Sequence, residues 1–545
     1  MTTQVRNWLL GFVGVLGLVA ALIQQCIPED EGGAGGAGGV AGSAGSATAG
    51  TGGSGGEVAS AGSGGAPSGG TGTGGSVTTG WNEYTPSSDS RIVYVSTTGS
   101  DSNNGLAPEN PVASPAAGYA LLRDGFPDHL LFKRGDVWTN GVFPSWKKSG
   151  RSASERMVVN AYGSGARPRF EVTQGWLTAG GGGAPTSVNN LAFVSLNTYL
   201  TTHDPARGTP TGRPHCVNWN RGLQNVRFED MRFEWCQVNF EAIDGAPFVG
   251  LHFFRSLFLD SYAVELSPGN VPHAQGLYVD NLPSGGGMRV EESVFDYCGW
   301  YPLAVPGTEP TIFNHCMYLQ EDDPHGIVVK GNVVMRASSH GAQLRSGGTL
   351  EGNAFIANPI GAFIGGQWHS TAPPASGAFQ AIATGNLFTA TVDSIPRTPH
   401  TSPAILRGWG FEINEWWPHG LPLVRIENNI VSHCDNSSAS TCQSLPTISA
   451  TSPGSPGWSG FASGSVVAGN TVWDVGNTRS GYQADSAGPF VDPNRSIASY
   501  SASIGNAATL DAFATELRKQ AKGNWREAYT APAIIQYFRA GLTAP

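Results

Sequence analysis

The sequence predicts an all-β solenoid of stacked parallel strands that ends in a short helical C-terminal segment. Short apolar strands recur in pairs, as in VRFEDMRF, IVVKGNVV and VRIENNIV. Each pair is broken by a polar step, often Gly-Asn, and these steps recur every 21 to 43 positions. Such a repeat is typical of a solenoid with one supersecondary unit per turn. The marker residues are Asp230, Ser256, Ser293, Asn332, Asn353, Asn386, Asn429 and Asn470.

Composition narrows the classes of partner. Charged residues make up 13% of the 545 positions, and the formal net charge is −10. A chain this acidic lacks the basic surface that nucleic-acid binding requires. Fifteen tryptophans are present, and such side chains either fill cores or stack on sugar rings.

The first 26 residues are typical of an export signal. Arg6 precedes an apolar stretch from Trp8 to Ile23, and Cys26 follows. Lipidation of Cys26 is one hypothesis. An uncleaved anchor and a cleaved signal with an incidental cysteine are the alternatives. Residues 27–80, rich in Gly, Ala and Ser, predict a flexible linker. We therefore expect an exported protein, secreted or held at the cell surface.

Six cysteines follow Cys26, which permits three disulfides in an oxidising compartment. Cys434 and Cys442 flank a short polar loop, and we expect them to pair. The spacings typical of zinc sites are absent from the sequence. The six are Cys216, Cys236, Cys298, Cys316, Cys434 and Cys442.

The start of the predicted domain carries a family resemblance. YVSTTGSDSNNGLAPENPVAS, from Tyr94 to Ser114, resembles the first segment of pectate-lyase-like right-handed parallel β-helix proteins. LLRDGFPDHLLFKRGDVW, from Leu121, resembles the segment that comes next. The resemblance implies a right-handed parallel β-helix over residues 81–490 and, by its family, work on an extracellular polysaccharide.

Residues 491–545 predict a helical tail that packs on the solenoid. FVDPNRSIASYSASIGN, from Phe490, resembles the C-terminal segment of other bacterial β-helix proteins. Thr509 can cap one helix that stops near Gly523, and a second is expected from Pro532 to Gly541.

The unit between Asn332 and Asn353 is the shortest, so we expect its outer face to form the floor of the main cleft between longer loops. Three strands align around it when their apolar positions are superposed. Gln343 and Arg345 should be exposed there. The outward columns are Tyr278, Tyr318 and Gln343, and Asp280, Gln320 and Arg345, with His273, His315 and His340 just before the strands.

These residue types suit β-elimination of a uronate, which needs a group that neutralises the carboxylate, a base and an acid. Arg345 or a bound cation fits the first role, His340 or His315 the second, and Tyr318 the third. Lys330 is held in reserve as the base. His340 shares the parity of the inward Leu344, so a structural histidine is the competing interpretation.

Other residues are candidates for substrate and metal binding. We expect Gln343, Gln320 and Tyr278, with Trp368 and Trp416 from long loops, to contact the substrate. Carboxylates of Asp280, Asp322 and Asp323 can hold Ca²⁺ by oxygen ligands, although an exposed acidic loop explains them as well. No other cofactor is expected.

Two further hypotheses remain open. A glycoside hydrolase would use paired carboxylates, and Glu412 with Glu415 or Glu241 with Asp244 are the available pairs, both outside the aligned columns. The third hypothesis is a non-catalytic carbohydrate-binding solenoid. In each case we expect a monomer with an acidic polysaccharide partner, no nucleic acid, and membrane contact only through the N-terminus.

Overall fold

The computed structural model divides the chain into two units, Met1–Thr73 and Gly74–Pro545, and every described residue belongs to the second. The described residues are 80–180, 185–241, 246, 248–267, 273–282, 287–321, 326–365, 378–390, 409–413, 422–433, 461–474 and 489–542. The expected export signal, linker and Cys434–Cys442 bridge lie outside them.

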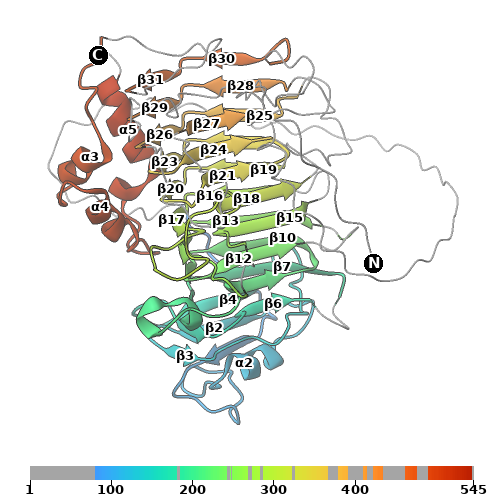
Figure 1. Cartoon of the computed structure of the whole chain (residues 1–545). Helices are drawn as coiled ribbons and strands as arrows, with labels where there is room; N and C mark the ends of the chain where they lie inside the picture. The colour runs from blue at the N-terminus through green and yellow to red at the C-terminus, as the bar shows by residue number, and fades with distance from the viewer. Residues whose placement is uncertain are drawn as a thin grey trace, which may run out of the picture. The chain divides into compact units, whose positions relative to one another are not determined.

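The second unit is a parallel β-helix of three sheets, in which each turn from β4 to β27 adds one strand to each sheet (Figure 1). The 12-stranded sheet contains β1 (Ile92–Val95), β2 (His129–Lys133), β4 (Met157–Tyr162), β7 (Ser187–Val194), β10 (Gly222–Glu229), β13 (Phe248–Phe254), β16 (Met288–Glu291), β19 (Ile327–Lys330), β22 (Gly348–Glu351), β25 (Ala381–Thr384), β28 (Val424–Glu427) and β30 (Val466–Ala468).

The 11-stranded sheet contains β3 (Val137–Thr139), β5 (Arg169–Val172), β8 (Asn197–Leu200), β11 (Arg232–Glu234), β14 (Leu257–Ser261), β17 (Val294–Cys298), β20 (Val333–Met335), β23 (Ala354–Ile356), β26 (Leu387–Thr389), β29 (Ile430–Ser432) and β31 (Thr471–Trp473). The 8-stranded sheet contains β6 (Leu177–Ala179), β9 (His215–Trp219), β12 (Gln237–Glu241), β15 (Leu277–Leu282), β18 (His315–Glu321), β21 (His340–Leu344), β24 (Ile360–Ile364) and β27 (Trp409–Ile413). The expected all-β solenoid is confirmed.

A buried asparagine ladder runs along the corner between the 12- and 11-stranded sheets. The amide Nδ2 of Asn386 donates to Oδ1 of Asn429 at 2.9 Å and to the backbone carbonyl of Leu350 at 3.0 Å. Its own Oδ1 accepts from the backbone N–H of Asn353 at 2.9 Å. The same bonds recur from Asn332 to Asn470. Each amide therefore satisfies two backbone groups of the preceding turn and the side-chain oxygen of the next, all inside the protein.

The residue before each ladder position takes a left-handed backbone conformation, with φ of 66° at Gly331, 59° at Gly352 and 64° at Gly385. Only glycine adopts this without cost, which explains the Gly-Asn signature. Ser256 and Ser293 continue the ladder into earlier turns. Asp230 does not belong to it, because the ladder position of that turn is Met231, whose N–H bonds to Ser256.

The interior is filled by side chains that stack from turn to turn. The rings of Phe193, Phe228 and Phe253 are stacked with centroids 5.0 Å apart at each step. Register between strands places like residues above each other, so each turn buries the apolar surface of the next. The helix α2 (Pro115–Leu121) packs beside β1 near the first turn, and the sequence did not predict it.

Three C-terminal helices cover the outer face of the 11-stranded sheet from β14 to β29: α3 (Ile497–Ser503), α4 (Leu510–Leu517) and α5 (Ala531–Leu542) (Figure 1). Thr509 caps α4 as expected, and that helix ends before Gly523. α3 was not predicted, although Ser496 and Ser499 form a capping box at its start. Phe513, Leu517, Ile534 and Phe538 pack against outward apolar residues such as Val294 and Val333. No helix among the described residues is long and apolar enough to cross a membrane.

One disulfide is present in the described part of the chain, between Cys216 and Cys236, with Cα atoms 5.5 Å apart. Cys298 and Cys316 are buried free thiols. The bridge joins β9 to the corner before β12 in the next turn, so it ties two adjacent turns together.

Removing one amide of the ladder should destabilise the protein. Asn386→Ala leaves the backbone N–H of Asn353 and the carbonyl of Leu350 without their side-chain partner, at a cost of about 1–3 kcal/mol for each buried group. Asn386→Ser, which keeps an oxygen as at the serine positions of the ladder, should lose less. Urea unfolding measures both. Equal stability of Asn386→Ala and the wild type would show that the ladder contributes nothing.

Candidate functional site

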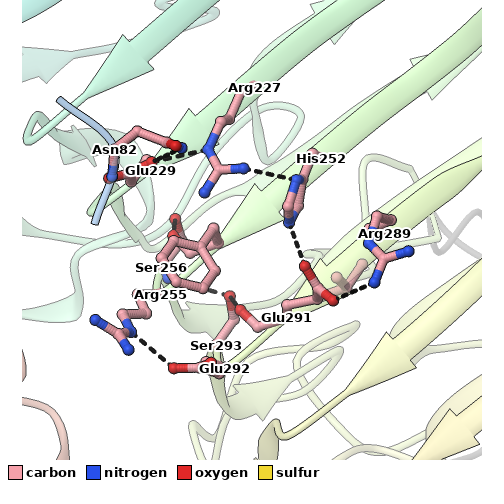
Figure 2. A network of polar contacts seen from close by, with 12 residues as sticks. Asn82, Arg227, Glu229, His252, Arg255, Ser256, Arg289, Glu291, Glu292 and Ser293 are labelled. Carbon is pink, nitrogen blue, oxygen red and sulfur yellow. Dashed lines mark hydrogen bonds and ion pairs between the residues drawn. The ribbon is translucent and has the colours of Figure 1, made fainter. Parts of the chain in front are cut away.

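The outer faces of the three sheets differ in which side chains they present. The 11-stranded sheet lies under the C-terminal helices. The outer face of the 12-stranded sheet carries the ion-pair network of Figure 2. The 8-stranded sheet carries the residues that the sequence singled out.

The network in Figure 2 is internally compensated. Nη1 of Arg227 lies 2.8 Å from Nδ1 of His252, and Nε2 of His252 lies 2.7 Å from Oε2 of Glu291. Arg289 donates to the same carboxylate at 2.6 Å. Burial raises the pKa of Glu291, but its bonds to His252 and Arg289 outweigh burial and lower the pKa to about 2. Each of these charges has its partner, so the network stabilises the sheet.

On the 8-stranded sheet the predicted column is confirmed by register. Tyr278 pairs with Tyr318, Tyr318 with Gln343, and Gln343 with Phe363. The alternate residues Val279, Leu319 and Leu344 are fully buried in the core.

The next residue in this column is Glu412, because Phe363 pairs with Glu412 of β27. The expectation that Glu412 lies in a loop outside the columns is therefore wrong. The strand WGFEI is only five residues long and lies between segments that are not strand-like in sequence. For this reason the sequence did not indicate a strand here.

The two candidate histidines lie against each other in neighbouring turns. Their ring centroids are 4.7 Å apart, and the ring of His315 stacks on Tyr318 at 4.8 Å. The ring of His340 meets the edge of Phe363 at 5.4 Å. Both contacts are with the outward column.

The inward parity expected for His340 is wrong. A Cβ placed on Gly341 would lie 2.8 Å from Cδ1 of the core residue Phe355. Ala342 also belongs to the core, so two successive residues face inward and the alternation shifts at this point. His340 consequently lies on the outer side with Tyr318.

The partner of each histidine defines its tautomer. Gln275 donates through Nε2 to the carbonyl of Phe313 at 2.9 Å, so its oxygen Oε1 faces Nδ1 of His315, also at 2.9 Å. An amide oxygen only accepts, so Nδ1 of His315 carries the proton and Nε2 holds the lone pair.

His340 has the same arrangement with Ser339. The Ser339 hydroxyl donates to the backbone carbonyl of Asn314 at 2.8 Å, and its oxygen lies 3.0 Å from Nδ1 of His340. Because the single hydroxyl proton is used on the carbonyl, Nδ1 of His340 donates to Ser339. Gln275 and Ser339 were not singled out from the sequence. The sequence gives one indication of their role. Ser339 directly precedes His340, and Gln275 occupies the position of His315 in the previous turn.

Burial holds the pKa of His315 well below its ordinary value, and the nearby His340, His273 and Arg345 lower it further. His315 is therefore neutral at neutral pH. A neutral imidazole with its lone pair on Nε2 can accept a proton.

Arg345 and Tyr318 complete the cluster. Cζ of Arg345 lies 6.0 Å from the ring centroid of Tyr318. The expected exposure is wrong, since Arg345 and Gln343 are each 6% exposed and Tyr318 is 9% exposed. Rings from adjacent turns stack on one another here, because parallel strands lie only about 4.8 Å apart. The structure thus brings His315, His340, Tyr318, Gln343 and Arg345 together on β18, β21 and the residue after β21.

The second column begins with two carboxylates. Glu241 pairs with Asp280, so the expectation that Glu241 lies outside the columns is wrong. The Tyr278 hydroxyl donates to Oδ2 of Asp280 at 2.9 Å. Gln320 donates to the same hydroxyl at 3.1 Å. Burial, and then the charge of Asp280, raise the pKa of Glu241. Such a pair can hold one proton between two acids.

Several expected site residues lie outside the described residues: Trp368, Trp416, Asp322, Asp323, Asp244 and Glu415. Among the described residues no group of three or more His, Cys, Asp or Glu side chains is placed to hold a metal ion. Because two of its three carboxylates are outside that range, the Ca²⁺ site stays a prediction.

No protein-family model and no curated protein matches the chain. Solved structures do. A lacto-N-biosidase from Eubacterium ramulus has 15% identity and a TM-score of 0.29, and the match covers 66% of this chain and 65% of that one, just under two thirds of its length. Pectate lyase Pel9A has 14% identity and a TM-score of 0.36, covering 77% and 86%. A rhamnogalacturonan lyase has 14% identity and a TM-score of 0.33, covering 74% and 91%.

These likenesses are of fold alone. The three parallel sheets confirm the parallel β-helix that the resemblance of Tyr94–Ser114 implied. The fold defines the chain as a parallel β-helix protein.

The buried histidines predict a loss of stability in acid. Burial lowers the pKa of His129, His203 and His215 to about 4, and His315 shifts the same way. These side chains bind protons in the unfolded chain below its ordinary pKa of about 6.5 but stay neutral when folded, so stability falls as pH drops through that value. Urea unfolding at pH 7.5, 6 and 5 measures the slope, and His215→Gln should reduce it. A stability independent of pH in this window would contradict the burial of neutral imidazoles.

Proposed function

We propose that the outer face of the 8-stranded sheet binds an acidic polysaccharide and cleaves it by β-elimination, as a polysaccharide lyase. The observation that carries this proposal is the assembly of His315, Tyr318 and Arg345 in two adjacent turns.

In this mechanism Arg345 pairs with the uronate carboxylate and stabilises the negative charge that develops there. Nε2 of His315 takes the C5 proton, the C4–C5 double bond forms, and the C4–O bond breaks. The Tyr318 hydroxyl donates its proton to the departing oxygen. The substrate carboxylate also raises the basicity of His315, since a nearby anion favours the imidazolium.

The remaining candidate residues take supporting roles. His340, stacked on His315, is the alternative base, and Gln343, Gln320 and Tyr278 line the path along which the chain would lie. Trp368 and Trp416 would supply stacking surfaces for sugar rings. A Ca²⁺ ion held by Asp280, Asp322 and Asp323 would add a second positive charge for the substrate carboxylate.

A glycoside hydrolase is the second candidate, and two observations favour keeping it. Glu412 lies in the aligned column, and Glu241 carries a raised pKa beside Asp280. An acid with a raised pKa next to an ionised carboxylate is the pairing that glycoside hydrolysis uses. A carbohydrate-binding role without catalysis is the third.

We also propose that the chain works outside the cytoplasm. The support is the sequence of residues 1–80, with its apolar stretch, Cys26 and Gly-rich linker, and the Cys216–Cys236 disulfide, a bond typical of oxidising compartments. We expect it to act as a monomer, on a polysaccharide outside the cell.

Tyr318→Phe tests the lyase most cleanly, because it removes the proposed acid and keeps the ring that stacks on His315. General acid catalysis is worth about 10²–10⁴-fold, so kcat should fall by at least about 100-fold with little change in the melting temperature. The assay is ultraviolet absorbance of the unsaturated uronate product on alginate, pectate and glycosaminoglycans, with and without chelator. Tyr94→Phe on β1 is the matched control.

The outcomes separate the three candidates. New reducing ends without absorbance, lost in Glu241→Gln, would select the hydrolase. Binding without either product would select the non-catalytic role. Arg345→Ala should abolish lyase activity and Arg345→Lys restore only part of it, since an ammonium cannot make the two-pronged carboxylate contact. Full activity of Tyr318→Phe and Arg345→Ala on every cleaved glycan would rule out this lyase site.

A further inference from the structure

A second polar site lies on the 12-stranded sheet, away from the proposed lyase face. One outward column runs through His129, Val158, Ala192 and Arg227, which pair in register on β2, β4, β7 and β10. The segment of residues 82–87 crosses this column. Asn82 donates to both carboxylate oxygens of Glu229, at 3.0 and 2.9 Å, and Figure 2 shows this anchor beside Arg227.

Tyr84 fixes the middle of the crossing segment. Its ring packs on the small outward apolar cluster of Val158, Ala192 and Val194, and its hydroxyl lies 3.3 Å from Oε2 of Glu229. The segment therefore holds a defined position over the sheet.

Between the segment and the sheet lies a cavity of about 260 Å³. Its polar lining includes Asn82, Tyr84, His129, Glu155, Arg156 and Arg227. The volume is a little below the roughly 300 Å³ at which pockets for drug-sized ligands begin. It suits a single small molecule.

The charges around the cavity do not balance. The carboxylate of Glu229 is paired with Arg227 at 2.8 Å, and that of Glu155 with Arg151 at 3.0 Å. Glu83, which also lines the cavity, is exposed and lies 3.8 Å from Lys522. Arg156 has no carboxylate partner among the described residues. Its Nη1 contacts only the backbone carbonyls of Leu191, at 3.3 Å, and Asn225.

The surroundings of Arg156 disfavour its charged form. Burial lowers the pKa of Arg156, and the positive charge of Arg227 lowers it further, with the phenol of Tyr84 opposing. His129 lines the same cavity as a neutral ring, since burial lowers its pKa to about 4. A half-buried cation beside a second cation is stabilised by an anion.

We propose that this cavity binds a small oxyanion, with Arg156 as the group that takes its charge. The neutral ring of His129 lines the same space and can donate one N–H to another of its oxygens. The shared chemistry is that of a carboxylate on a single sugar acid and of a free inorganic oxyanion. The site lies on a different sheet from the proposed lyase face, so the two proposals are independent.

Calorimetry on the full chain tests this site with galacturonate, glucuronate, inorganic phosphate and sulfate, and with neutral galactose for comparison. Arg156→Gln removes the charge. Ala153→Trp fills the cavity from an exposed lining position and removes no polar contact. Arg425→Gln, which removes an arginine from the same face at β28, is the matched control.

At least one of the acids should bind the wild type and the control equally and bind both cavity variants at least ten-fold more weakly, while galactose does not bind. Preference for the sugar acids or for the inorganic anions identifies the source of the ligand. If Arg156→Gln fails to fold, Ala153→Trp decides. The proposal is overturned if no acid binds, or if binding survives both cavity variants. Binding that is lost only in Arg345→Ala overturns it too, because that acid is held at the other face.

Discussion

The register of the stacked turns is the constraint on which the rest of this structure depends. Strands pair in parallel with their like positions aligned, and the asparagine ladder from Asn332 to Asn470 satisfies the corner that joins two of the sheets. Because the strands pair in register, residues at the same position of successive turns lie above one another in a column. A residue type that recurs at that position in the sequence therefore forms a continuous surface. Each outer face of the protein is built from such columns.

The columns on the three outer faces consist of different residue types. Apolar columns on the 11-stranded sheet, through residues such as Val294 and Val333, receive the C-terminal helices. Alternating charges on the 12-stranded sheet neutralise each other around His252, except near Arg156. The 8-stranded sheet gathers histidine, tyrosine and arginine in adjacent turns, and the proposed function rests on this face.

Sequence reasoning recovered what is local and periodic. Gly-Asn steps predicted the repeat, and the structure shows that a left-handed glycine and a bonding amide are both used at that corner. Superposed apolar positions predicted the pairing of Tyr278, Tyr318 and Gln343, because side chains alternate along a strand. The side on which His340 lies was missed, because the alternation shifts at Gly341 and Ala342, and only the core around Phe355 reveals it. Three other features depend on neighbours from other turns, which the sequence of one strand does not reveal. They are the burial of Arg345, the hydrogen bonds of Gln275 and Ser339 that set the histidine tautomers, and the position of Glu412 in the outward column.

We propose that Arg345, Tyr318 and His315 form one binding surface for an acidic glycan. A crystal structure of the chain with an unsaturated or slowly cleaved uronate oligosaccharide would show whether they do. We expect a sugar carboxylate within hydrogen-bonding distance of the Arg345 guanidinium, with C5 facing Nε2 of His315. An oligosaccharide bound along another sheet, with the Arg345 side chain untouched, would contradict it.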